Sequence, residues 1–206
     1  MSNPNGPTGT KFTQAEMIAL AEATASQGNL LVIDEAYVDF SDYDHLCMIR
    51  NSNHVIIIRS FSKGFGMAGM RLAMIVSSKS IIDYLARWNM SSSVSATAIA
   101  VAEHLFDNID VVHSVWDEIK NLRRQLSDSI SQKIPEIIPL PSSGNFIPLM
   151  CQNNSRAIEI LKRLSKDNFL VRAMNKMGGS DKCLRVTIAE RLVMEQFLDS
   201  LIAATK

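Results

Sequence analysis

The chain has 206 residues, with 21 basic and 21 acidic side chains and a hydrophobic fraction of 47%. This apolar content suffices for a folded core and excludes a disordered chain, and the 9 glycines and 6 prolines are too few for a collagen-like one. Because the net charge is zero, the composition gives no indication of binding to nucleic acid or to an anionic membrane surface.

A turn rich in asparagine, proline and glycine occupies residues 3–9. Thr13 follows, with Glu16 three residues later. This spacing is that of a capping box, in which each side chain accepts a hydrogen bond from the other residue's backbone N–H. It predicts a helix that runs to about Ser26.

Short apolar runs then predict strands at residues 30–33, 55–58 and 71–77. The first run ends at Asp34 and the second near Ser60. Continuous runs rich in β-branched residues are typical of strands buried on both faces, so we expect an α/β sheet covered on both sides.

After residue 78 the pattern is mainly helical. Helices are predicted at residues 79–90, 94–107, 110–132, 154–167 and 191–204, and three prolines end the third of them. Strands are predicted at residues 145–150, 169–174 and 183–189. This second part therefore reads as an α+β unit with three short strands.

The cysteines and histidines indicate neither a disulfide framework nor a metal site. Cys47, Cys151 and Cys183 lie far apart and form no C-x-x-C pair, which favours a reducing compartment.

The chain starts without a signal-peptide pattern, and no apolar run approaches the roughly 18 residues of a membrane span. We expect a soluble cytoplasmic protein. The histidines, which show no metal-ligand spacing and are expected on the surface or on helices, are His45, His54, His104 and His113.

Two predicted strands end in chemically reactive side chains. Asp34 follows the first strand, and Lys63 comes shortly after the second. Ligands of open α/β sheets bind at the carboxyl ends of the strands. Taken alone, each residue is more often a solvated loop residue, but an acid and an amine after neighbouring buried strands form an unusual pair.

The segment from Gly64 to Gly69 matches the G-x-G-x-x-G pattern of dinucleotide-binding proteins. That function requires a helix to begin at the turn and an acidic residue at the end of a strand about 20 residues further on. Here the strand pattern at 71–77 follows almost at once. We therefore expect the glycines to form a tight loop between antiparallel strands.

Several segments resemble, in order and spacing, the fold-type-I pyridoxal-phosphate aminotransferases, and among them the histidinol-phosphate aminotransferases. The segments are Asn3-Pro-Asn-Gly-Pro-Thr-Gly9, Asp34-Glu-Ala-Tyr37, Ser60-Phe-Ser-Lys63, Ala68-Gly-Met-Arg71, Gly144-Asn-Phe146, Leu170-Val-Arg172 and Cys183-Leu-Arg185. The resemblance runs from residue 3 to the end. It implies an α/β fold: residues 1–85 as part of the large cofactor-binding domain with a mixed, mostly parallel sheet, and residues 86–206 as a linking long helix and a small α+β domain.

The resemblance implies pyridoxal 5'-phosphate as cofactor. Lys63 would form the Schiff base with its aldehyde and later move a proton as general base and acid. Asp34 would pair with the pyridinium nitrogen, which lets the ring accept electrons. Tyr37 would bind the 3′ oxygen, and Ala36 would pack against the ring.

Other residues would bind the anionic groups. Arg71 would clamp the cofactor phosphate, because a guanidinium can donate two parallel hydrogen bonds. Ser60 and Ser62 would donate hydroxyl hydrogen bonds to the same phosphate. Arg172 and Arg185 match arginines that bind the substrate's anionic groups, and Asn145 matches an asparagine that lines the site. Without the resemblance, Arg185 reads as a surface residue of an edge strand.

The implied reaction transfers an amino group between an amino acid or amino-alcohol phosphate and a 2-oxo acid, in histidine biosynthesis. The partners are small molecules, with neither nucleic acid nor membrane, and the complete enzyme is expected to be a homodimer. Alternatives are a threonine-phosphate decarboxylase-like enzyme on the same fold, or a non-catalytic half that serves in assembly.

The chain departs from the family in two ways. Gly6 stands where the family has an asparagine that contacts the cofactor, and Asn5 or Asn3 could replace it. Family members also carry a long segment before this turn, which holds further strands and phosphate-binding groups. We therefore expect a C-terminal portion, which by itself binds the cofactor weakly and turns over poorly, if at all.

Overall fold

The computed structural model describes residues 1–50, 52–88, 93–174 and 182–206. The chain divides into two compact units, which are described separately: unit 1 is Met1–Asn5 with Lys11–Trp116, and unit 2 is Gly6–Thr10 with Asp117–Lys206. The division falls within the long helix α5 (Ile109–Lys133), which the sequence assigned to the link. The domain boundary between residues 85 and 86 stays a prediction.

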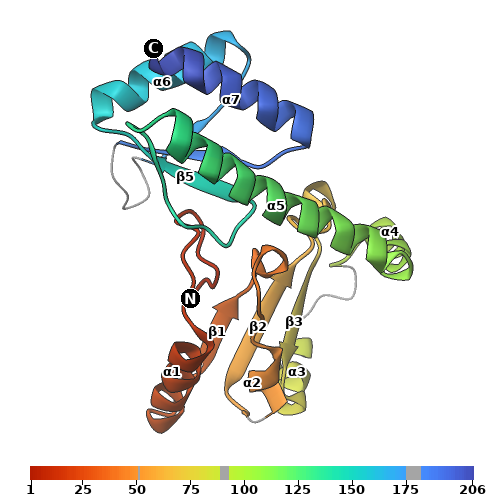
Figure 1. The fold of residues 1–206 in the computed structure, drawn as a ribbon. Coiled ribbons are helices and arrows are strands. Elements are labelled where there is room, and N and C mark those ends of the chain that lie inside the picture. Colours follow the sequence, from red (N-terminus) through yellow and green to blue (C-terminus); the bar gives the residue numbers. More distant parts are fainter. Residues whose placement is uncertain (51, 89–92, 175–181) are drawn as a thin grey trace. The chain divides into compact units, whose positions relative to one another are not determined.

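Unit 1 contains a mixed three-stranded sheet (Figure 1). Its strands are β1 (Leu31–Asp34), β2 (Val55–Ser60) and β3 (Ala73–Ser77), in the order β1-β2-β3. The β1 and β2 strands are parallel, whereas β2 and β3 are antiparallel. The three strands lie where the sequence predicted them, and the antiparallel pair confirms the tight-loop interpretation of the glycine segment.

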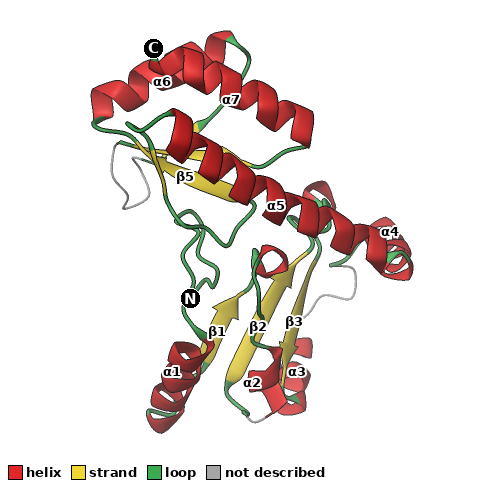
Figure 2. Ribbon diagram, viewed as in Figure 1, coloured by secondary structure: helices red, strands yellow, loops and turns green. Residues whose placement is uncertain are grey.

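The helices of unit 1 begin with α1 (Gln14–Ser26), and the predicted capping box between Thr13 and Glu16 is confirmed. Figure 2 shows the helices in red and the strands in yellow. The predicted helices after the sheet are α3 (Lys79–Ala86) and α4 (Ala96–Asp107); residues 89 and 90 of the first prediction lie outside the described residues. Short elements that the sequence did not predict are η1 (Val38–Phe40), α2 (Leu46–Arg50) and η2 (Ala68–Met70).

One face of this sheet is covered by α1 and α2. Leu31, Ile33, Val55 and Ile57 pack there against side chains of the two helices. On the other face, Val32 is 39% exposed and Ile75 is 46% exposed. The prediction that the strands are buried on both faces is therefore wrong for β1 and β3. An apolar run shows only that the side chains are hydrophobic. Their burial also requires a layer of helices or strands packed against that face of the sheet.

Unit 2 contains a four-stranded antiparallel sheet in the order β4-β5-β7-β6. Its strands are β4 (Ile138–Pro139), β5 (Phe146–Met150), β6 (Arg172–Ala173) and β7 (Cys183–Thr187). The prediction of three strands is wrong, because β4 is too short to leave a pattern in the sequence. The strand predicted at 169–174 is confined to β6.

Three helices supply the core of unit 2. Side chains from α5, α6 (Asn154–Lys166) and α7 (Arg191–Thr205) form one buried cluster with β5 and β7. Asn153 caps α6 by accepting a hydrogen bond from the backbone N–H of Arg156. Cys151 and Cys183 are buried and free, and burial raises the pKa of the Cys151 thiol to about 11.

In the described part of the chain, every helix is too short or too polar to cross a membrane.

Candidate active site

The polar side chains expected at the strand ends do meet at one edge of the unit 1 sheet. Asp34 pairs with Ile58 in the parallel register, so the ends of β1 and β2 lie side by side. The exposed Lys63 follows β2, and its Nζ lies 5.7 Å from the centroid of the Tyr37 ring. The acid, the phenol and the amine therefore share the carboxyl edge of the sheet, where ligands of such sheets bind.

Asp34 is fixed by its own backbone and by the turn that follows it. Its N–H donates to the carbonyl of Met1 at 2.8 Å, and its carbonyl accepts from the N–H of Asn3 at 2.9 Å. One carboxylate oxygen accepts from the N–H of Ala36 at 3.0 Å, which folds the chain into the turn that presents Tyr37. Asp34 as a whole is exposed.

The loop after β2 is held by hydrogen bonds within itself. The Ser60 hydroxyl accepts from the N–H of Ser62 at 3.1 Å, and the Lys63 carbonyl accepts from the N–H of Gly66 at 3.2 Å. Gly66 has a φ of 68°, a conformation that favours glycine. The chain then forms η2 and enters β3, so the dinucleotide interpretation has no helix at the required place.

Arg71 closes this loop in a left-handed backbone conformation, with a φ of 55°. For a residue with a side chain this conformation costs about 1–3 kcal/mol, and such residues concentrate at functional sites. The exposed guanidinium donates to the carbonyl of Ala68 at 3.1 Å, which leaves further N–H groups of the fork for a ligand.

A buried polar network behind this edge was missed by the sequence interpretation. Asn3, Glu35 and His45 are each 1% exposed. The expectation that His45 lies on the surface or on a helix is wrong, because it is buried and precedes α2. His45 Nδ1 lies 2.6 Å from the Glu35 carboxylate, and His45 Nε2 lies 3.0 Å from Asn3 Nδ2. The amide nitrogen of Asn3 can only donate, so Nε2 of His45 accepts and Nδ1 donates to Glu35, which is the pattern of a neutral tautomer.

Two further contacts complete the network. Arg59 Nε donates to the second Glu35 oxygen at 2.9 Å, and its guanidinium lies 2.9 Å from the Asp44 carboxylate. Asn3 Oδ1 accepts from the N–H of Phe12 at 2.9 Å. Both ends of the Asn3 amide are therefore engaged in the interior, which makes Asn3 a poor candidate for a ligand contact. Partners so distant in sequence leave no periodic signal.

The anion-binding residues expected in unit 2 lie on neighbouring strands. Arg172 of β6 stands directly opposite Arg185 of β7, so the two side chains project from the same face of the sheet. The Arg185 guanidinium lies 5.1 Å from the centroid of the Phe146 ring. Within the described residues, Arg185 Nε is a buried donor without a hydrogen-bond partner. Two like charges and an unpaired donor favour an anionic ligand here. Asn145 precedes β5, and its carbonyl accepts from the N–H of Ile188 at 2.9 Å.

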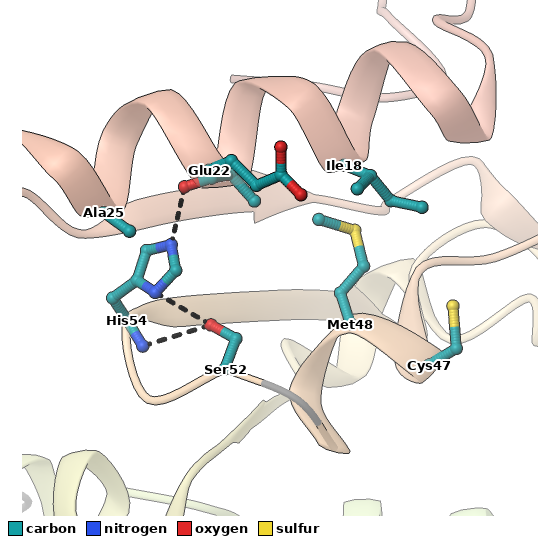
Figure 3. A pocket seen from close by; sticks show the side chains of 8 residues that line it. Ile18, Glu22, Ala25, Cys47, Met48, Ser52 and His54 are labelled. Atoms are coloured by element: carbon teal, nitrogen blue, oxygen red, sulfur yellow. Dashed lines mark hydrogen bonds between the residues drawn. The ribbon is translucent and has the colours of Figure 1, made fainter.

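A cavity of about 420 Å³ lies elsewhere in unit 1, between α1 and the segment around α2 (Figure 3). His54 in its wall is already engaged: Nε2 donates to the carbonyl of Ala21 at 2.8 Å, and Nδ1 accepts from the Ser52 hydroxyl at 2.9 Å. His54 lies just before the start of β2, whereas Lys63 follows its end, so the cavity lies at the opposite end of this strand from Lys63. Among the described residues, no group of three or more His, Cys, Asp or Glu side chains could hold a metal ion.

Comparison with known proteins identifies relatives of this chain. The model of the aminotransferase class I and II family matches residues 1–201. Histidinol-phosphate aminotransferase 2 of Archaeoglobus fulgidus is 30% identical over 201 residues, which cover 98% of this chain and 56% of that protein. Histidinol-phosphate aminotransferase 1 of Ralstonia nicotianae is 30% identical, with 99% of this chain and 54% of that protein covered.

Solved structures agree with this assignment. The histidinol-phosphate aminotransferase of Sinorhizobium meliloti in complex with pyridoxal-5'-phosphate has a TM-score of 0.87 and 25% identity, covering 100% of this chain and 56% of that one. The L-threonine-O-3-phosphate decarboxylase of Porphyromonas gingivalis shares the fold, with a TM-score of 0.84, 22% identity and coverage of 98% and 62%. The chain spans about half the length of the curated relatives it matches. The α/β transferase fold expected from the sequence is confirmed, and the chain belongs to the aminotransferase class I and II family.

Proposed function

We propose that this chain carries the cofactor lysine of a pyridoxal-phosphate-dependent aminotransferase of the histidinol-phosphate type. The observation that carries the proposal is the meeting of Asp34, Tyr37 and Lys63 at the carboxyl edge of the unit 1 sheet. When bound, pyridoxal 5'-phosphate supplies an electron sink for the substrate's Cα. The donor set at this edge fits the cofactor: a carboxylate for its nitrogen, a phenol for its oxygen and an amine for its aldehyde.

In this function each residue at the edge has a defined task. Asp34, anchored through Ala36 and Met1, would keep a proton on the pyridine nitrogen of the cofactor. Tyr37 would donate a hydrogen bond from its phenol to the cofactor's 3′ oxygen. Lys63 would hold the cofactor through its aldehyde, and its Nζ would act as the base that accepts the proton from the substrate's Cα. The exposed position of Lys63 leaves this amine free to move.

The phosphate of the cofactor is assigned to the loop that follows β2. Arg71 offers its guanidinium fork, and Ser60 and Ser62 offer hydroxyl groups at the start of the loop. Ala36, next to Asp34, leaves room for the ring because its side chain is small. Asn5 takes the contact that the family assigns to the residue replaced here by Gly6.

The substrate's anionic groups are assigned to unit 2. Arg172 and Arg185 stand opposite each other, and an anion would relieve their repulsion and pair the buried Nε of Arg185. Asn145 would line the same site. A substrate with both carboxylate and phosphate groups suits two arginines, as expected for an amino-alcohol phosphate and a 2-oxo acid. We also propose that the complete enzyme is a cytoplasmic homodimer.

Equilibrium binding tests the assignment of the cofactor residues. The absorbance of pyridoxal 5'-phosphate is titrated with the wild-type chain and with Asp34→Asn, Tyr37→Phe and Arg71→Ala. Each of the three variants should bind about 10-fold or more weakly, because each loses a charge or a donor. Asp83→Asn, on the exposed side of α3, is the matched control and should bind as the wild type does. Equal binding by all variants would refute the site.

Product analysis separates transamination from decarboxylation. Release of a 2-oxo acid from the amino donor supports the aminotransferase, and release of carbon dioxide supports an enzyme like the Porphyromonas gingivalis neighbour. We favour transamination because the curated relatives at 30% identity are aminotransferases.

A further inference from the structure

The backbone of Gly64, immediately after Lys63, is hydrogen-bonded by two side chains that are distant in sequence. The indole Nε1 of Trp116, on α5, donates to the carbonyl of Gly64 at 2.7 Å. The N–H of Gly64 donates to the carboxylate of Asp39, on η1. The Lys63 carbonyl accepts a hydrogen bond from the Gly66 N–H. The Lys63 carbonyl, the Gly64 N–H and the Gly64 carbonyl therefore each have a hydrogen-bond partner.

The fit of Gly64 against Asp39 is close enough to require glycine. A Cβ on Gly64 would lie 2.1 Å from Asp39 Oδ2 and 2.6 Å from Asp39 Cγ. On the other side, Phe65 packs edge-on against Trp116, with ring centroids 5.4 Å apart, and tilts against Phe61 at 4.8 Å. The loop that carries Lys63 therefore has a polar anchor and an aromatic anchor.

Asp39 lies among other charged groups of unit 1. Burial raises the pKa of its carboxyl to about 6, the positive Arg59 opposes this rise, and the negative Glu35 adds to it. The Gly64 N–H and His113, on α5, also lower the pKa. Arg59 is held in place by Glu35 and Asp44. Asp39 thus changes charge in the mildly acidic range, and it touches the peptide of the proposed cofactor lysine.

We propose that Asp39 and Trp116 are positioning residues that clamp the Lys63–Gly64 peptide, and that protonation of Asp39 loosens the clamp. A hydrogen bond to a charged carboxylate is about twice as strong as one to a neutral acceptor, so the Gly64 N–H is held less firmly once Asp39 is neutral. The catalytic consequence rests on the proposed function of Lys63. The clamp itself is a property of this chain and can be measured without cofactor.

Nuclear magnetic resonance of the chain tests the clamp. The Gly64 amide should shift with pH, with a midpoint near 6 that matches the titration of the Asp39 carboxyl carbon in the same sample. In Asp39→Asn the Gly64 shift should disappear, and in Asp83→Asn it should persist. His113→Gln should keep the titration and move its midpoint to higher pH. A flat Gly64 signal in the wild type, or a titration that survives in Asp39→Asn, would overturn the proposal.

A second readout connects the clamp to Lys63. The wild-type chain, Asp39→Asn and Trp116→Phe are mixed with pyridoxal 5'-phosphate and reduced with borohydride, and the rate of labelling at Lys63 is compared. In both variants Lys63 should be labelled about 10-fold more slowly, because a small displacement of the reacting amine lowers its reaction rate. If the Gly64 titration depends on Asp39 but the label appears on other lysines, the clamp stands and the proposed function fails. If Lys63 is labelled equally in all three, the function stands and the positioning role fails.

Discussion

The sheets of the two units differ in how their apolar strands are used. In unit 2, the β5 residues Phe146, Ile147 and Leu149 are at most 1% exposed, and α5, α6 and α7 contribute to the buried cluster around this strand. In unit 1, Val32 and Ile75 are 39% and 46% exposed although their strands are equally apolar. Unit 2 is held mainly by its hydrophobic core, whereas unit 1 adds a buried polar network beside a thinner core.

This difference coincides with the position of the proposed cofactor site. The buried polar side chains Asn3, Glu35 and His45 lie directly behind the strand ends that present Asp34 and Lys63. Polar networks fix side-chain geometry more narrowly than apolar packing, but they lose stability when one member is removed. The comparison predicts that substitutions in the apolar core of unit 2 mainly change stability, and that substitutions in the polar network of unit 1 also change the candidate site.

The largest effect is expected in the core of unit 2. Phe197 is 1% exposed and lies in the buried apolar cluster of unit 2. Phe197→Ala should therefore lower the free energy of unfolding by about 4 kcal/mol, because it leaves a cavity. Urea unfolding followed by circular dichroism measures the change. Ile75→Ala, on the exposed face in unit 1, is the control and should cost about 1 kcal/mol or less. Equal losses would remove the contrast between the sheets.

The next largest effect is expected in the polar network. Glu35→Ala should lower the free energy of unfolding by about 3 kcal/mol, because Arg59 and His45 both lose their buried carboxylate partner. The same variant should weaken binding of pyridoxal 5'-phosphate. Asp83→Ala, which breaks only the exposed pair with Lys79, should change stability by less than about 0.5 kcal/mol. A Glu35 variant as stable as the Asp83 variant would contradict the structural role of the network.

The charge of Asp39 should make stability depend on pH. Its pKa in the folded chain, about 6, lies above the ordinary value of 3.8, so the folded state holds the proton more tightly than the unfolded state. This contribution is full below about pH 4 and is lost as the pH rises through 6. Relative to Asp39→Asn, the wild type should therefore lose roughly 2 kcal/mol of unfolding free energy between pH 4 and pH 7. Parallel stability curves for the two proteins would refute this.

The smallest effect is expected at the start of α1. Thr13→Ala removes the side chain that caps the Glu16 N–H, and should cost about 1 kcal/mol. Thermal unfolding of the variant and of Ser26→Ala, at the other end of the same helix, gives the comparison. A cost at Thr13 no larger than at Ser26 would show that the capping box contributes little.

Much of the fold follows from local patterns in the sequence. The Thr13–Glu16 capping box, the strands of unit 1 and the antiparallel return after Gly69 each depend on residues close in the chain. The site motifs were recognisable because their order and spacing resemble a family. Local patterns describe which residue types stand near each other, and this information suffices for elements and motifs.

The remaining features depend on tertiary contacts. The burial of His45 requires Glu35 and Asn3, which lie 10 and 42 residues away. The two-residue strands β4 and β6 exist only as partners of β5 and β7. The exposure of Val32 and Ile75 depends on which layers surround the sheet, and the strand sequence contains no information on that. The Asp39–Gly64–Trp116 clamp likewise joins segments with no shared pattern.

The central claim is that Lys63 is the lysine to which the sheet edge directs the cofactor. The most direct test mixes the 206-residue chain with pyridoxal 5'-phosphate, reduces it with borohydride and maps the labelled peptides by mass spectrometry. The label should lie on Lys63, should be lost in Lys63→Arg, and should be unchanged in Lys79→Arg, which removes another exposed lysine of unit 1. A label spread evenly over the surface lysines, or one unaffected by Lys63→Arg, would contradict the account.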